Sequence, residues 1–292
     1  MRPIGIRSQL ATQAILVLVG VFVLVPIWAL AIIATDGSIL GLPRTFELLP
    51  ASPTVDRFVQ AWVREGHELD FIGLLRNSLF VSGLSAAVAL VFGASMAYAF
   101  ARFRFPGRRA GLFVILVGAF LPPIAIATPL FILFFGLESA VPELREIGFR
   151  GSTPALAILY AAFALPLAIW LMRAAFWSVP AELEDAAYVD GAGRLRTFVS
   201  ITLPIAAPSI LVAALVAFLL GYSEFAIAWL FAQSEENITL AMVLATAQVG
   251  IFSTNWGQTA AHALLMTLPV VIIFLALQRL LLKGSLVGSA SD

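Results

Sequence analysis

The sequence predicts an all-α membrane protein that crosses the bilayer six times, and two observations support this fold class. First, 61% of its 292 residues are hydrophobic and only 12% are charged, about half the charged fraction usual in soluble domains. A soluble domain with this composition would expose large apolar patches, whereas lipid tails solvate apolar side chains. Second, the apolar residues form uncharged runs of about 20 residues, the length of a transmembrane helix, without the alternation typical of a membrane barrel.

The six predicted spans follow the uncharged apolar runs and together make one transmembrane domain, residues 1–292. Their ranges are 14–34, 77–101, 110–137, 152–172, 201–234 and 255–278. The third span contains Pro122, Pro123 and Pro129, which predict kinks. The fifth is long enough to hold a broken or tilted helix, and Glu224 is its only charged residue.

The basic residues predict that both termini face the cytoplasm, because Lys and Arg favour cytoplasmic segments. With this orientation, 11 of the 17 basic residues are cytoplasmic and 6 lie outside. Outer loops then fall at about 35–76, 138–151 and 235–254, and inner loops at 102–109 and about 173–200. The first apolar run follows Arg2 and Arg7, as a signal peptide would, but its 21 uncharged residues exceed a signal core of about 7–15 residues. We therefore interpret it as an uncleaved span.

Composition also excludes several classes of function. Zero net charge gives no basic field for nucleic acid, and the absence of cysteine excludes thiol catalysis and cysteine zinc sites. His67 and His262 are too far apart for a zinc-binding HExxH helix. The single lysine, Lys283, precedes Gly284 instead of the Ser or Thr of a Walker A loop, so no such ATP site is expected. We predict a protein that is not an enzyme and has no metal or cofactor of its own.

The second inner loop, residues 178–204, has the most informative sequence. Ser178 and Pro180 predict the start of a helix, whose positive end would be favoured by the three acids that follow, Glu182, Glu184 and Asp185. Residues 190–193, Asp-Gly-Ala-Gly, predict a break. A second short helix would then place Leu195, Phe198 and Val199 on one face. These residues alone fit a solvated connector and a docking element for a cytoplasmic protein equally well.

The spacing of this loop resembles the EAA loop of bacterial ABC-importer permeases, whose pattern is Glu-Ala-Ala, three residues, Gly, nine residues, Ile, one residue and Leu-Pro. Here Asp185-Ala186-Ala187 is followed after three residues by Gly191, and after nine more by Ile201, Leu203 and Pro204. Asp185 stands where that family usually has Glu. Residues 97–108 are similar to the carbohydrate-importer branch, and residues 268–285 to the shorter maltose-transporter-type permease.

The resemblance implies an importer-type permease fold with cytoplasmic coupling helices, in a bacterial inner membrane. It implies a heterodimer with a second permease, two cytoplasmic ATPase subunits that hold ATP and Mg, and an extracytoplasmic sugar-binding protein. The substrate implied is an oligosaccharide or disaccharide such as maltose, trehalose or another α-glucoside, and glycerol phosphate is a further candidate. Glu184 and Asp185 are expected to pair with basic groups of the ATPase, and Gly191 to set the turn. The full set of implied coupling residues is Glu184, Asp185, Ala186, Ala187, Asp190, Gly191, Ile201, Leu203 and Pro204.

Tyr222, Ser223 and Glu224 are the candidate residues of a substrate path. A carboxylate within a membrane span is costly and is expected to face the bundle interior or a cavity. Glu224 then either accepts a hydrogen bond from a sugar hydroxyl or gates the path, or it makes a structural hydrogen bond or a pair near the outer interface. An alternative class is a secondary transporter driven by an ion gradient, which would favour internal repeats with charges at corresponding positions. A membrane-embedded enzyme would need clustered His, Asp or Glu. The sequence has neither pattern.

Overall fold

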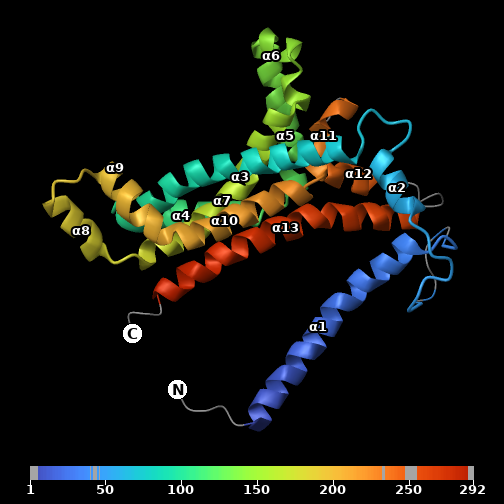
Figure 1. Ribbon diagram of the computed structural model, residues 1–292. Coiled ribbons are helices and arrows are strands. Elements are labelled where there is room, and N and C mark those ends of the chain that lie inside the picture. The colour runs from blue at the N-terminus through green and yellow to red at the C-terminus, as the bar shows by residue number, and fades with distance from the viewer. Residues whose placement is uncertain are drawn as a thin grey trace. The chain divides into compact units, whose positions relative to one another are not determined.

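The computed structural model describes residues 6–39, 41, 45, 47–231, 234–246 and 255–288, with side chains described between residues 8 and 278 of these ranges. This part of the chain contains helices and no strand (Figure 1). Six of the helices are long and apolar enough to cross a membrane, as predicted. The chain divides into two compact units, which are described separately: residues 1–71 with 244–268, and residues 72–243 with 269–292.

The second unit is built on three long helices, α3, α7 and α10, which run side by side (Figure 1). Helix α3 covers Phe71–Arg102, α7 covers Thr153–Ser178 and α10 covers Leu203–Ser223. Where they cross, the buried side chains are small, which lets the backbones approach closely; these residues are Ala86, Ala89, Ala161, Ala164 and Ala217. A Cβ on Gly221 would lie 3.3 Å from the Cα of Ser82, so α10 meets α3 almost backbone to backbone.

The third predicted span is two helices, α4 (Arg108–Ala119) and α5 (Pro123–Ala140), instead of one kinked helix over 110–137. The break lies at Phe120–Pro122, where Pro122 is extended, with a ψ of 133°. A residue that precedes a proline is driven out of the helical region, and Pro122 precedes Pro123. Pro129 lies inside α5 without ending it. The tandem prolines therefore end a helix, whereas the single proline is accommodated.

The fifth predicted span is broken near its end. Helix α10 ends at Ser223, Glu224 is extended, and α11 (Ala226–Phe231) follows. Further short helices occupy the predicted outer loops: α2 (Asp56–Val63), α6 (Pro142–Glu146) and α12 (Leu240–Thr246), with 3-10 turns at Phe149–Gly151 and Glu235–Asn237. Residues 247–254 of the third outer loop lie outside the described residues.

Two polar residues in the second turn of α3 anchor the loop after α11. The Asn77 side-chain amide donates to the carbonyl oxygens of Glu236 (2.7 Å) and Ile238 (3.1 Å), and the hydroxyl of Ser78 accepts from the backbone N–H of Leu240 (2.9 Å). Both polar side chains are buried. These hydrogen bonds satisfy backbone groups that would otherwise be unpaired in an apolar environment.

The first unit contains α1 (Ile6–Thr35), α2 and the part of α13 (Trp256–Gly288) up to Leu268. Its core is again built from small residues, Ala34, Ala61, Ala260 and Ala261. His262 is buried here and lies edge-on to Phe71, with ring centroids 6.1 Å apart. This environment is that of a packed helix residue.

The carboxylate of Asp36 organises the loop after α1. It accepts hydrogen bonds from the Ser38 hydroxyl (2.6 Å) and from the backbone N–H groups of Ala51 (2.7 Å), Ser38 (2.9 Å) and Ser52 (3.2 Å). These bonds, that of the Ser38 hydroxyl first, lower the pKa of Asp36 from 3.8 to about 2. Hydrogen bonds to the ionised form favour it, so the folded state binds this proton more weakly than the unfolded chain does.

Asp36→Asn is therefore expected to lower the free energy of unfolding at neutral pH and to reduce the loss of stability at acid pH. Because the folded pKa is the lower one, the stabilisation is present above about pH 4 and is lost as the pH falls towards about 2. Thermal unfolding measured across this range tests it, with Asp56→Asn as a matched exposed control. Parallel pH profiles for wild type and Asp36→Asn would contradict the assignment.

Candidate functional site

The loop predicted as the coupling element forms two helical segments joined by a tight turn, at one end of α7 and α10 (Figure 1). Helix α8 covers Ala181–Val189, and the chain resumes in α9 (Arg194–Thr197). The expected separate second helix is wrong in one respect: α9 continues through a π-helical turn, Phe198–Thr202, directly into α10. The expected cap is also wrong, because Ser178 is the last residue of α7 and its hydroxyl donates to the Ala175 carbonyl (2.8 Å).

Gly191 makes the turn between the two segments. Its φ is +83°, in the left-handed region that glycine enters without steric cost. The N–H of Gly191 donates to the Tyr188 carbonyl (3.1 Å), and the N–H of Ala192 to the Ala187 carbonyl (2.9 Å). This is the hydrogen-bond pattern of a Schellman motif, which satisfies the last carbonyls of α8.

The carboxylate of Glu184 is buried and fastens α8 to the rest of the second unit. Its Oε1 accepts from Arg102 Nε (3.0 Å) and from the Thr202 hydroxyl (2.7 Å), and its Oε2 accepts from the Tyr98 hydroxyl (3.2 Å). Arg102 also donates to the Val179 carbonyl (2.6 Å). One carboxylate therefore joins α8, the end of α3 and the π turn before α10.

This arrangement corrects the expectation that Glu184 pairs with a basic group of a partner. Its carboxylate is already engaged by three donors of its own chain, and the side chain is only 6% exposed. Its neighbour Asp185 is exposed, as are Ala186 and Asp190, whereas Ala187 is buried. Side chains at consecutive helix positions point about 100° apart, so Glu184 can face the interior of the unit while Asp185 faces its surface.

The outer surface of the loop combines charge with exposed apolar side chains. Val189 (87% exposed) and Leu195 (75% exposed) flank the turn, and Leu183 and Val199 are also exposed. Of the other predicted coupling residues, Ile201 in the π-helical turn and Leu203 at the start of α10 are half-buried, and Pro204 is exposed. Exposed apolar side chains on a projecting element are typical of protein-binding surfaces.

A second feature is a cavity of about 370 Å³ between α4, α5, α7 and α10, and Ser223 and Glu224 line it. Its wall is otherwise mostly apolar, with Tyr160, Phe163, Leu167, Leu220 and Phe225 among the lining residues. Tyr222, the third predicted path residue, is buried and stacks on Phe218, with ring centroids 5.5 Å apart, outside the lining.

The comparisons with known proteins identify the class of this chain. Residues 89–285 match the family described as binding-protein-dependent transport system inner membrane component, and this match covers more than half of the sequence. The chain belongs to this family. The permease is accordingly a multi-pass membrane protein of the inner membrane, and its predicted resemblance to ABC-importer permeases is confirmed.

Relatives of the permease are named as permease proteins of transport systems. It is 34% identical over 244 residues to a putative ABC transporter permease protein of Streptomyces antibioticus, covering 84% of this chain and 100% of the relative. It is 33% identical to the trehalose transport system permease protein SugB of Mycobacterium tuberculosis, over 75% of this chain and 77% of that one. The trehalose/maltose transport system permease protein MalG of Thermococcus litoralis is 28% identical, over 94% and 93%.

The fold of the permease is also that of a solved importer. The crystal structure of a bacterial ABC transporter involved in the import of the acidic polysaccharide alginate contains a similar chain, with a TM-score of 0.70 and 22% identity. The similarity covers 96% of this chain and 99% of that one. The all-α importer permease fold predicted from the sequence is thereby confirmed.

The permease residues that sequence reasoning missed are the partners of Glu184. Tyr98 and Arg102 precede it by 86 and 82 residues, and Thr202 follows by 18. Their only sequence signal is that Arg102 is a basic residue at the end of an apolar span. That signal indicates a membrane boundary and does not point to a particular carboxylate.

Glu224→Ala is expected to destabilise the permease by about 1 kcal/mol, because the side chain caps α11. Its two carboxylate oxygens accept from the N–H of Ile227 at 3.0 and 3.2 Å, and one of them from the N–H of Ala228 at 3.4 Å. Glu224→Gln keeps one acceptor oxygen and is expected to retain most of the stability. Thermal unfolding of both variants measures this, and equal losses for alanine and glutamine would contradict the capping role.

Proposed function

We propose that this permease is half of the membrane channel of an ATP-driven sugar importer. It would pair with a second permease, dock its 178–204 loop onto a cytoplasmic ATPase, and receive sugar from an extracytoplasmic binding protein. ATP hydrolysis, with its Mg, would take place in two separate ATPase subunits. The observation that carries this proposal is the exposed α8–turn–α9 loop, which has the spacing of a coupling loop and is fastened to α3 and α10 through Glu184.

The anchored loop explains how force would pass from the ATPase to the membrane helices. A coupled machine requires two global states that differ in their contacts with each partner. Movement of a docked α8 would be transmitted to α3 through Arg102 and to α10 through Thr202 and the continuous helix from Arg194. If the loop were flexible and lacked the hydrogen bonds of Glu184, movement of α8 would not be transmitted to α3 and α10.

The substrate we propose is a disaccharide or oligosaccharide such as maltose, trehalose or another α-glucoside. Support comes from the relatives, whose names include trehalose, trehalose/maltose and maltodextrin transport permeases. Ser223 and Glu224 line the cavity through which a path could run, and Phe163, which also lines it, has an aromatic ring of the kind that stacks on sugars. The capping bonds of Glu224 still leave acceptor capacity on its carboxylate, because an ionised carboxylate has about four lone-pair sites.

The alternative of a secondary transporter driven by an ion gradient is less well supported. Such transporters commonly place charged groups at corresponding positions of two repeats near the membrane midplane. In the described residues, Glu138 of α5 pairs with Arg150 of the 3-10 turn, and Arg102 at the end of α3 pairs with Glu184 of α8. Both pairs lie near helix ends and connect a spanning helix to a loop. The family match also assigns the chain to binding-protein-dependent systems.

Charge reversal at Asp185 tests the docking proposal. Asp185→Arg is expected to lower both recovery of the ATPase with the purified permease and sugar uptake by at least about tenfold, since like charges across an interface cost several kcal/mol. Glu146→Arg, an equal change at an exposed acid of α6, is the matched control and is expected to retain both. Full ATPase recovery with Asp185→Arg would overturn the docking assignment, and failure of the unmodified permease to bring down any ATPase would overturn the proposed function.

A further inference from the structure

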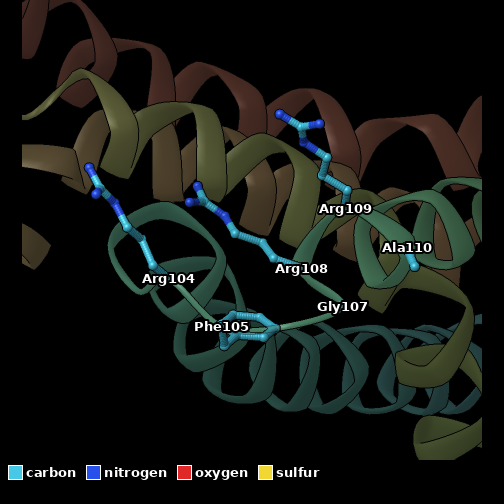
Figure 2. Close-up of a pocket in the computed structure, with 6 residues that line it drawn as sticks. All are labelled: Arg104, Phe105, Gly107, Arg108, Arg109 and Ala110. Carbon is cyan, nitrogen blue, oxygen red and sulfur yellow. The ribbon is translucent and has the colours of Figure 1, made fainter.

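The short segment between α3 and α4 carries a basic hollow that the coupling proposal does not use. Its volume is about 520 Å³, and its lining residues are Arg104, Phe105, Gly107, Arg108, Arg109 and Ala110 (Figure 2). Figure 2 shows the three arginine side chains extending to the same side of this segment, with the ring of Phe105 beneath them. Three arginines from six consecutive residues therefore line one open space.

The positive charge of this hollow is not neutralised by the described part of the chain. Arg104 and Arg109 are exposed, and no described acidic side chain forms an ion pair with them or with Arg108. Arg108 makes one long hydrogen bond, to the Ala101 carbonyl at 3.4 Å. Elsewhere in the same unit, Arg102 and Arg150 each pair with a buried glutamate. The hollow thus differs from the sites of Arg102 and Arg150, each of which holds an internal anion.

An exposed tryptophan beside the hollow marks the level of the membrane interface. Trp177 is 60% exposed, and both Arg108 and Arg173 lie over its ring, at 5.6 Å and 5.7 Å from the centroid. Tryptophan is enriched where lipid headgroups meet the hydrocarbon region, and arginine beside it reaches the phosphates of that layer. We therefore expect the hollow to lie at the depth of the lipid headgroups.

An apolar track leads away from the hollow along α4. Phe113 and Val117 follow Arg109 at four-residue intervals, so the three share one face of the helix, and Val114 adjoins them. Phe113 (66%), Val114 (67%) and Val117 (46%) are all exposed. A cationic end that continues into an exposed apolar face matches an amphiphile with an anionic head.

We propose that this hollow binds the phosphate of an anionic phospholipid, with the acyl chains lying along Phe113 and Val117. Guanidinium groups bind phosphate oxygens through paired, charge-assisted hydrogen bonds, and basic clusters at a span end attract anionic lipid headgroups. The N-terminus of α4, which has no side-chain cap, adds the positive end of a helix dipole beside the arginines. Free phosphate would satisfy the arginines but would leave the apolar track uncovered. This proposal is independent of the transported substrate and of the docking loop.

The test compares lipids retained by the assembled permease complex. The complex is incorporated into nanodiscs with equal phosphatidylglycerol and phosphatidylcholine, and native mass spectrometry counts the lipids that remain bound. Wild type is expected to retain phosphatidylglycerol preferentially. Arg104→Gln/Arg109→Gln is expected to reduce this preference by about 25-fold, since each basic residue contributes a factor of about five. Arg76→Gln/Arg145→Gln removes two exposed charges from other sites and is expected to keep the preference.

Two further measurements make the outcome decisive. Arg104→Lys/Arg109→Lys retains the charge and is expected to restore at least half of the preference, which a mere folding defect would not do. An equal preference in the hollow variant and in the Arg76/Arg145 variant would overturn the proposal. Thermal stabilisation of the complex by millimolar inorganic phosphate in pure phosphatidylcholine, lost in Arg104→Gln/Arg109→Gln, would assign the site to free phosphate and overturn the lipid assignment.

Discussion

Glu184→Ala is expected to destabilise the permease by about 3–5 kcal/mol and to lower ATP-driven uptake more than tenfold. Removing one partner of a buried ion pair leaves the other charge without compensation, which costs far more than the pair contributes to stability. Here Arg102, whose side chain is 15% exposed, would keep only its bond to the Val179 carbonyl. Thr202 and Tyr98 would lose their acceptor as well. Thermal unfolding and uptake into intact cells measure the two effects.

Asp185→Ala is the control for this prediction, because it alters the adjacent acid on the exposed side of the same helix. A surface substitution of this kind usually changes stability by less than about 0.5 kcal/mol. We therefore expect Asp185→Ala to leave the unfolding temperature unchanged while weakening recovery of the ATPase. The two variants would then distinguish the internal anchoring role of Glu184 from the docking role of Asp185. Equal stability losses in the two variants would show that Glu184 has no special internal role.

A double-mutant cycle with Glu184→Gln and Arg102→Met measures the pair itself. Contacting residues of one hydrogen-bond network usually show coupling energies of about 0.5–3 kcal/mol, whereas independent sites are additive. Glutamine keeps an acceptor for Thr202, so the cycle isolates the charge interaction with Arg102. Additive losses would mean that the 3.0 Å contact contributes no net coupling to the folded state.

The helices were predictable from the sequence because the bilayer fixes their minimum length and composition. All six predicted spans correspond to long helices, although α3 starts at Phe71 instead of residue 77 and the third span is two helices. Two adjacent prolines are compatible with a kink and with a break, and the sequence does not distinguish them. The side of the membrane on which each loop lies stays a prediction based on basic residues.

The candidate site was predictable only where its pattern is local. The spacing from Asp185 to Pro204 lies within one loop, and it located the exposed helix and its turn. The anchor of that helix joins residues from three segments, and nothing in the sequence pairs Glu184 with Arg102 in preference to Arg104 or Arg108. Likewise, Glu224 was predicted to face the bundle interior or a cavity. It lines a cavity, but its capping of α11 depends on the break after Ser223.

Gly191→Val is expected to lower ATP-driven uptake about tenfold, because valine strains the backbone conformation at this position. The φ of +83° at this residue is a genuine outlier for a β-branched side chain, and forcing it costs about 1–2 kcal/mol. No atom lies within 4 Å of the position a Cβ would occupy, so no steric clash contributes. The strain would instead open the turn and move α8 from its docking position. Uptake and recovery of the ATPase are expected to fall together.

Gly193→Val supplies a closely matched control for this prediction. Gly193 lies two residues away and, like Gly191, has no atom within 4 Å of the position a Cβ would occupy. Its φ of −72° and ψ of 161° are in the extended region, which β-branched residues adopt without strain. We expect this variant to keep near-normal uptake. Gly191→Asn is expected to lie between the two, because asparagine tolerates the left-handed region better than valine. If Gly191→Val and Gly193→Val reduced uptake equally, the added side chain would be responsible and the turn conformation would not. If Gly191→Val kept full uptake, the loop would not be the coupling element.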